Sequence, residues 1–129
     1  YVSVTGVQTC ALPISDFISI HTPLTDETRN MISDEQFDMM KETAVIVNAA
    51  RGGIINEKAL YTALKKKKIY AAASDVFTSE PPVQDDWVQE LIHMDNFILT
   101  PHIGSRTVEA ESNTVEMATD NLIRLLEEA

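Results

Sequence analysis

The stretch from Thr43 to Gly53, TAVIVNAARGG, decides the fold class of this chain. It starts with an apolar run, Ala44 to Val47, that lacks the alternation of apolar and polar residues typical of a half-exposed strand. A short continuous apolar run of this kind is typical of a parallel sheet whose strands are buried on both faces. Small and polar residues follow and end in Gly52 and Gly53, so the strand is expected to end in a turn.

The same pattern recurs on both sides of this stretch. Helical patterns separate the apolar runs: Ser33 and Gln36 stand where a capping box would begin a helix, and Asn56 can cap a second helix. Further strands are expected at 17–20, 69–77 and 96–100. Beyond the helix that follows Ser33, helices are expected at 57–68, at 88–94 as one short turn, and from 105 or 106 to 128 as one long amphipathic helix.

This order of elements predicts an open α/β sheet. Helices between consecutive strands imply parallel crossover connections, as in Rossmann-like folds. In such sheets, ligands bind beyond the carboxyl ends of the strands. The polar residues that follow the four strands should therefore line one rim. They are His21 and Thr22, residues 48–53, Asp75, and residues 102–105.

Composition excludes several classes of function. The 129 residues carry 20 acidic and 10 basic side chains, a net charge of −10, which argues against nucleic-acid binding. No apolar run approaches the ~18 residues of a membrane-spanning helix, and no signal peptide is recognised at the start. The single cysteine, Cys10, excludes an internal disulfide framework and a zinc cluster. A cytoplasmic protein without a metal site is expected.

The first fifteen residues, YVSVTGVQTCALPIS, differ from the rest of the chain. They carry no charge and show no clear helical or strand period. The string from Val4 to Ile14 also resembles the translation of a common sequencing-library adapter. We therefore expect residues 1–15 to be non-native, the alternative being a short strand and turn containing Pro13. No function is assigned to Cys10 or Gly6.

Three side chains on the expected rim suggest chemistry. Arg51 is followed by two glycines, which let the backbone approach a ligand, and a guanidinium can grip a carboxylate with two parallel hydrogen bonds. His102 lies between Pro101 and Gly104, directly after a buried strand, where an imidazole could act as an acid or base. Glu80 could orient and charge such a histidine. Taken singly, each residue also fits a surface or structural role.

The remaining polar residues leave alternatives open. Asp75 ends a strand of small residues, so it is either a turn former or an acceptor for a ligand amide. His21 also follows a strand but lacks a matching partner, and is interpreted as structural. His93 lies in a poorly patterned polar stretch and is interpreted as a surface residue.

The motifs ARGG, DVFTSEPP and TPHIG, in this order and spacing, resemble those of the D-isomer-specific 2-hydroxyacid dehydrogenases. The segment HTPLTDETRNMI and the long terminal helix fit as well, so the resemblance covers residues 16–129. It implies that Arg51 holds the carboxylate of a 2-hydroxy or 2-keto acid. It implies that His102 is the general acid/base and that Glu80 pairs with it.

The resemblance also implies NAD as the cofactor. Asp75 matches the residue on the carboxamide side of the nicotinamide. Positions matching the family's cofactor lining are Thr22, Ala49, Ala50, Arg51, Asp75, His102, Ile103, Gly104 and Ser105. No metal is implied.

Parts of the family pattern are missing. The four glycines, Gly6, Gly52, Gly53 and Gly104, cannot form the G-x-G-x-x-G loop that cradles the pyrophosphate. The resemblance thus implies a partial NAD-binding domain at 16–104 and a helix at 105–129 leading toward an absent substrate domain. We expect the isolated chain to bind NAD poorly and to be inactive. A homodimer is expected of the full-length parent.

Within the family, 3-phosphoglycerate is the expected substrate. The alternatives are a glyoxylate/hydroxypyruvate reductase and a D-lactate dehydrogenase. A formate dehydrogenase fits less well, because that branch has glutamine at the position of Glu80. A non-catalytic corepressor that uses NAD as a ligand is the alternative from another class. The choice between NAD and NADP is not readable from these residues.

Overall fold

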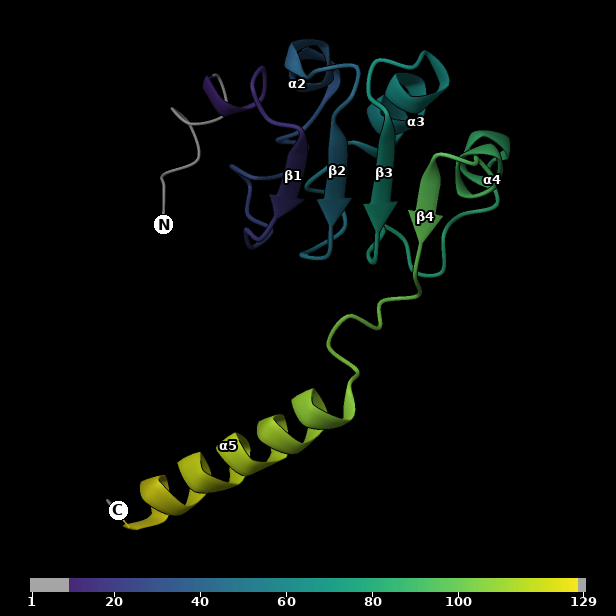
Figure 1. Ribbon diagram of the computed structural model, residues 1–129. Helices are drawn as coiled ribbons and strands as arrows, with labels where there is room; N and C mark the ends of the chain where they lie inside the picture. Colours follow the sequence, from purple (N-terminus) through teal and green to yellow (C-terminus); the bar gives the residue numbers. More distant parts are fainter. Residues whose placement is uncertain (1–9, 128–129) are drawn as a thin grey trace.

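The computed structural model describes residues 10–127 and contains one four-stranded parallel sheet (Figure 1). The strands lie side by side in chain order, and in register Ile18 pairs with Ile46, which pairs with Ala72. The open parallel α/β sheet predicted from the sequence is confirmed. The strands are β1 (Phe17–Ile20), β2 (Val45–Asn48), β3 (Ala71–Ser74) and β4 (Phe97–Leu99).

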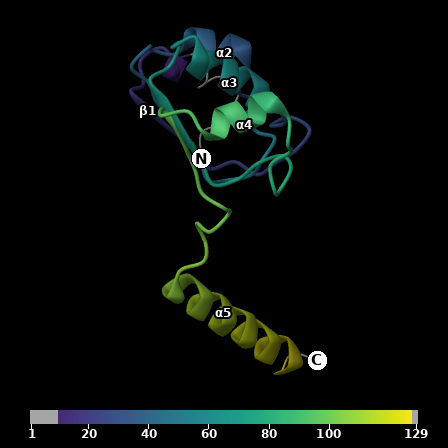
Figure 2. The same cartoon turned by 90° about the vertical axis from the view of Figure 1, so that its right-hand side faces the viewer.

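Three helices connect the strands and lie together on one face of the sheet (Figure 2). A fourth helix follows the last strand and extends away from the sheet (Figure 1). The helices are α2 (Asp34–Met39), α3 (Glu57–Lys65), α4 (Asp86–Ile92) and α5 (Val108–Glu127).

Local hydrogen bonds explain where two of the helices begin. Oδ1 of Asn56 accepts from the backbone N–H of Ala59 at 3.0 Å, so the predicted cap of α3 is confirmed. Oε1 of Gln36 accepts from the backbone N–H of Ser33 at 3.0 Å, as the predicted capping box requires. The other boundaries differ from prediction by a few residues. Helix α4 begins earlier and helix α5 later than the patterns indicate.

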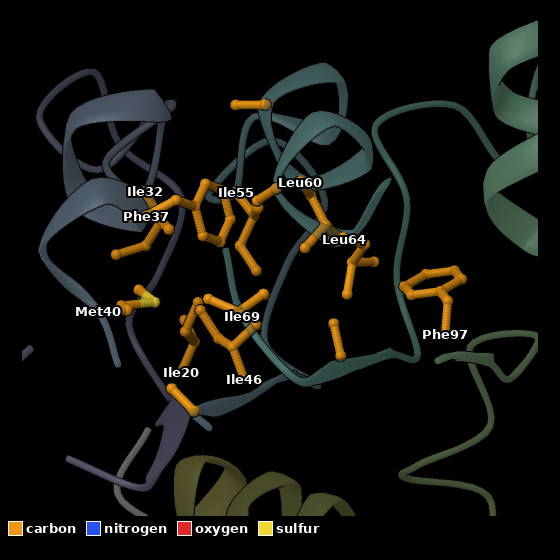
Figure 3. Close-up of a cluster of buried hydrophobic side chains, with 14 of the residues drawn as sticks. Ile20, Ile32, Phe37, Met40, Ile46, Ile55, Leu60, Leu64, Ile69 and Phe97 are labelled. Atoms are coloured by element: carbon orange, nitrogen blue, oxygen red, sulfur yellow. The ribbon is translucent and has the colours of Figure 1, made fainter. Parts of the chain in front are cut away.

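The hydrophobic core lies between the sheet and helices α2 to α4 (Figure 3). Phe37 of α2, Ile46 of β2 and Leu64 of α3 are each at most 1% exposed. Burying a side chain of this size stabilises the fold by about 1.5–3 kcal/mol. The core thus fixes the sheet, and the sheet fixes where its carboxyl ends lie.

The opposite face of the sheet is open within the described residues, so the expectation of burial on both faces is wrong here. Phe17 of β1 is 80% exposed and Ile98 of β4 is 64% exposed. Side chains of a strand alternate between the two faces, and all three connecting helices lie on one of them. Helix α5 likewise buries none of its side chains, although its apolar residues keep helical spacing.

The start of the described chain contributes to the core. Leu12 is 4% exposed and belongs to the buried cluster, whereas Cys10 is exposed. Residues 1–9 lie outside the described part of the chain. The expectation that residues 1–15 are non-native stays a prediction.

Candidate functional site

The polar residues after the four strands lie along one edge of the sheet, where all four arrows end (Figure 1). This follows from the parallel order, because parallel strands present their carboxyl ends on the same side. We call this edge the rim. It carries the loops after β1, β2, β3 and β4, which hold every candidate catalytic and cofactor-lining residue predicted from the sequence.

His102 and Glu80 form the central pair of the rim. Nδ1 of His102 lies 2.8 Å from Oε2 of Glu80, although 22 residues separate them in the chain. Their side chains are 45% and 40% exposed, so both can be reached from solvent. The hydrogen bond from His102 lowers the pKa of Glu80, and a second from the backbone N–H of Phe77 lowers it further. Glu80 therefore stays a carboxylate at neutral pH.

Asp75 contacts the loop that carries His102. Its Oδ1 accepts from the hydroxyl of Thr100 and from the backbone N–H of Ile103 at 3.0 Å. Its Oδ2 accepts from the backbone N–H of Gly104 at 2.8 Å. Burial acts to raise the pKa of Asp75, but the hydrogen bonds from Thr100, Gly104 and Ile103 outweigh burial, so its pKa is lowered.

The backbone of His102 is in the left-handed region, with φ of +56°. A non-glycine residue rarely adopts this conformation, which costs roughly 1–3 kcal/mol unless the surroundings hold it. The sequence motif has a glycine two residues later, but the histidine itself takes the unusual conformation. From this backbone conformation, the imidazole of His102 reaches Oε2 of Glu80.

Arg51 is exposed and does not contact the His102–Glu80 pair. Its guanidinium Nη1 donates to the carbonyl of Ala50 at 2.7 Å. The turn around it is held by Asn48, a buried side chain whose Oδ1 accepts from Ala50 N–H at 3.1 Å and whose Nδ2 donates to the Arg51 carbonyl at 3.0 Å. The guanidinium is thus available to a ligand while its backbone is fixed.

The turn of Arg51 packs closely against the loop that leads to Glu80. A Cβ on Gly52 would lie 2.0 Å from the carbonyl oxygen of Phe77, so only glycine fits there. Oε1 of Glu57, in the first turn of α3, accepts from the backbone N–H of Thr78 at 2.6 Å. These two contacts set the spacing between the Arg51 turn and the Glu80 loop.

Two hollows of the surface share Ala49 in their lining. One, of about 640 Å³, is lined by residues 21–24 and 49–51. The other, of about 330 Å³, lies on the open face of the sheet and is lined by apolar and small residues together with Asp75. The hydroxyl Oγ1 of Thr22 is buried without a hydrogen-bond partner in the described chain. An orphaned buried hydroxyl beside a hollow suits a polar group of a ligand.

The residues predicted from sequence are distributed as follows. Thr22, Ala49, Ala50 and Arg51 line the first hollow, and Ala49, Asp75, Ile103 and Gly104 line the second. Glu80 and His102, with Asp75, line a third of about 400 Å³. Ser105 is exposed and lines none of these three.

Sequence reasoning missed the roles of three residues that shape the rim. Asn48 was expected on the rim, and its role could have been found, since an asparagine between a strand and a turn often bonds its own backbone. Thr100 and Glu57 could not, because their partners Asp75 and Thr78 lie 25 and 21 residues away in the chain.

The described residues contain no group of three or more His, Cys, Asp or Glu side chains that could hold a metal ion. Between residues 10 and 127, no helix is both long and apolar enough to cross a membrane.

Comparison with known proteins identifies the family. Residues 5–104 match the D-isomer specific 2-hydroxyacid dehydrogenase, NAD binding domain. The D-3-phosphoglycerate dehydrogenase of Methanocaldococcus jannaschii is 48% identical over 112 residues, which are 87% of this chain and 21% of that protein. The hydroxypyruvate reductase of Thermotoga maritima is 50% identical over 97 residues, which are 75% of this chain and 31% of that protein.

Solved structures agree with the sequence comparison. The D-lactate dehydrogenase of Lactobacillus jensenii, solved with NAD+, superposes with a TM-score of 0.84 at 36% identity, covering 93% of this chain and 39% of that one. The chain therefore spans between about a fifth and two fifths of the length of these relatives. This chain belongs to the D-isomer specific 2-hydroxyacid dehydrogenase family and represents part of its NAD-binding domain.

Proposed function

We propose that this chain carries the catalytic residues of an NAD-dependent dehydrogenase that interconverts a D-2-hydroxy acid and its 2-keto acid. The observation that supports this most is the hydrogen bond between His102 Nδ1 and Glu80 at the rim of the sheet. A carboxylate on Nδ1 fixes the tautomer and leaves Nε2 free to exchange a proton with a substrate.

Each of the three side chains has a distinct role in this proposal. Arg51 holds the substrate carboxylate with two parallel hydrogen bonds, which its exposed guanidinium permits. His102 Nε2 takes the proton of the 2-hydroxyl group in oxidation and returns it in reduction. Glu80 stabilises the imidazolium formed when that proton arrives. The substrate thereby loses one proton to His102 and one hydride to the cofactor, which gives the 2-keto acid.

The residues along the two hollows would line part of a bound dinucleotide. Bound NAD supplies the acceptor for the hydride. Thr22 offers its unpartnered hydroxyl to a polar group of the cofactor, and Ala49 and Ala50 allow close approach because they are small. Ile103 and Gly104 face the second hollow, where they would cover the nicotinamide, and Asp75 lies beside them. Ser105, which lines neither hollow, is the weakest member of this predicted set.

For the substrate we propose 3-phosphoglycerate. The similarity to the phosphoglycerate dehydrogenase of Methanocaldococcus jannaschii supports this choice. Hydroxypyruvate is the second candidate, because the Thermotoga maritima relative named for it is equally similar. The homodimer and the cytoplasmic location expected of the full-length parent stay predictions.

A substrate panel with the full-length parent tests the proposal. The gene would be extended from its source DNA and the protein assayed by loss of NADH absorbance with 3-phosphohydroxypyruvate, hydroxypyruvate, glyoxylate and pyruvate, each also with NADPH. Turnover of the phosphorylated acid alone is expected. Turnover of the smaller acids alone would replace 3-phosphoglycerate by the reductase substrates. Cofactor binding without turnover of any acid would favour the corepressor.

A further inference from the structure

The carboxylate of Asp75 bonds the His102 loop on both sides of the histidine. Its three donors are the Thr100 hydroxyl, two residues before His102, and the backbone N–H groups of Ile103 and Gly104, one and two residues after it. Asp75 itself follows β3, whereas the loop follows β4. One side chain thus ties two neighbouring strand ends together across the rim.

The loop is shaped to receive this carboxylate. A Cβ on Gly104 would lie 2.9 Å from Asp75 Oδ2, so the carboxylate occupies the space where a side chain would otherwise stand. At the centre of the loop, His102 holds its left-handed conformation, with φ of +56°. A conformation that an L-residue rarely adopts persists only when the surrounding structure fixes it.

We propose that Asp75 is a positioning residue, which holds the loop on both sides of His102 so that the imidazole meets Glu80. The inference deepens the proposed function and rests on it for the role of His102 in the reaction. A direct role of Asp75 toward the nicotinamide carboxamide, predicted by resemblance, would have to share oxygens that already accept three protein donors.

The pKa of Glu80 reports whether His102 is in place. The direction in which this pKa shifts when Asp75 is replaced distinguishes a positioning role of Asp75 from a purely electrostatic one. The hydrogen bond from His102 is the main cause that lowers the pKa of Glu80, whereas the negative charge of Asp75 acts to raise it. If Asp75 acted only as a charge, neutralising it would lower the pKa of Glu80. If Asp75 positions His102, its loss frees the histidine and the pKa of Glu80 rises toward its ordinary value.

The test is a carbon-13 NMR titration of the Glu80 carboxyl in the whole chain and in Asp75→Asn. The amide of asparagine cannot accept from all three donors, so an upward shift of the Glu80 pKa is expected. Asp95→Asn, at an exposed aspartate in the loop before β4, is the matched control and should leave the Glu80 pKa unchanged. A lower or unchanged Glu80 pKa in Asp75→Asn would overturn the proposal.

A second variant keeps the test decisive if Asp75→Asn does not fold. Thr100→Val removes one donor to Asp75 and leaves the carboxylate and its two backbone hydrogen bonds. A smaller upward shift of the Glu80 pKa is expected, and no shift in this variant would also count against the proposal.

Kinetics of the full-length parent give an independent readout. Asp75→Asn should lower kcat by ~10-fold or more through misplacement of His102, with KM for NADH changed by less than ~3-fold. A raised KM for NADH with unchanged kcat would instead assign Asp75 to the carboxamide. If the parent is inactive with every keto acid while the Glu80 pKa rises as expected, the proposed function fails and the positioning role stands.

Discussion

The covered face of the sheet and the rim at its carboxyl ends are held together by different forces. Between the sheet and helices α2 to α4, apolar side chains such as Phe37 and Ile46 are packed and almost fully buried. At the rim, half-exposed side chains such as Glu80 and His102 are held by hydrogen bonds. Stability is therefore expected to depend mainly on the buried core, and the geometry of the site mainly on the hydrogen bonds of the rim. A substitution in one region should affect its own property far more than the other.

The largest effect on stability is expected in the core. Phe37→Ala should lower the free energy of unfolding by about 3–5 kcal/mol, because it removes a side chain that is 1% exposed and leaves a cavity. Phe17→Ala, on the open face where the ring is 80% exposed, should change it by less than about 0.5 kcal/mol. Urea unfolding of both variants makes the comparison. Equal losses would mean that the open face is covered in solution.

The next effect concerns the contact between the Arg51 turn and the Glu80 loop. Gly52→Ala would place a Cβ 2.0 Å from the Phe77 carbonyl oxygen, so the backbone must move, at a cost of about 1–3 kcal/mol. Gly104→Ala meets only the Asp75 carboxylate, at 2.9 Å, and should be less destabilising. The midpoints of thermal unfolding rank the two variants, and the reverse ranking would contradict this account of the rim.

A smaller effect is expected where the rim joins the core, at the start of α3. Asn56→Ala removes the acceptor for the Ala59 N–H and should cost about 1 kcal/mol in the free energy of unfolding. Asn56→Asp retains an acceptor and should differ from the wild type by less than about 0.5 kcal/mol. Urea unfolding measures both variants. A similar loss of unfolding free energy in the two variants would show that the missing cap acceptor is not the cause of the loss.

The smallest effect is the contribution of the rim carboxylates to stability at low pH. The pKa values of Asp75 and Glu80 are lowered in the folded chain. Such groups stabilise the fold above their unfolded pKa, roughly 4, and this contribution is lost as the pH falls through the folded pKa. The free energy of unfolding should therefore decline below about pH 4, and less steeply in Glu80→Gln. If the free energy of unfolding of that variant declined as steeply with falling pH as that of the wild type, the His102–Glu80 contact would not contribute to stability.

Sequence patterns predicted the sheet because they reflect local physics. Continuous apolar runs gave the four strands in order, and Asn56 and Ser33 marked two helix starts by their capping chemistry. The expectation of burial on both faces was wrong. Phe17 and Ile98 are apolar, as in a strand covered on both faces, but no described element of this chain covers them.

The candidate site was less predictable from local patterns than the sheet was. The pairing of His102 with Glu80 was predicted from the resemblance of the motifs, although 22 residues separate the two in the chain. The three-way bonding of Asp75 could not be read from sequence, because it depends on the approach of the loops after β3 and β4. The unusual backbone of His102 was equally hidden, since histidine adopts a positive φ more often than most residues but still only rarely.

The most direct test of the proposed catalytic role is the turnover of His102→Ala in the full-length parent, with His93→Ala as the control. His93 is exposed, and its ring contacts only the Gln89 carbonyl among the described hydrogen bonds. With 3-phosphohydroxypyruvate, His102→Ala should lose ~10²–10⁴-fold in kcat while the Kd for NADH stays within ~2-fold, because a general acid/base acts on the transition state. Turnover equal to that of His93→Ala would contradict the account.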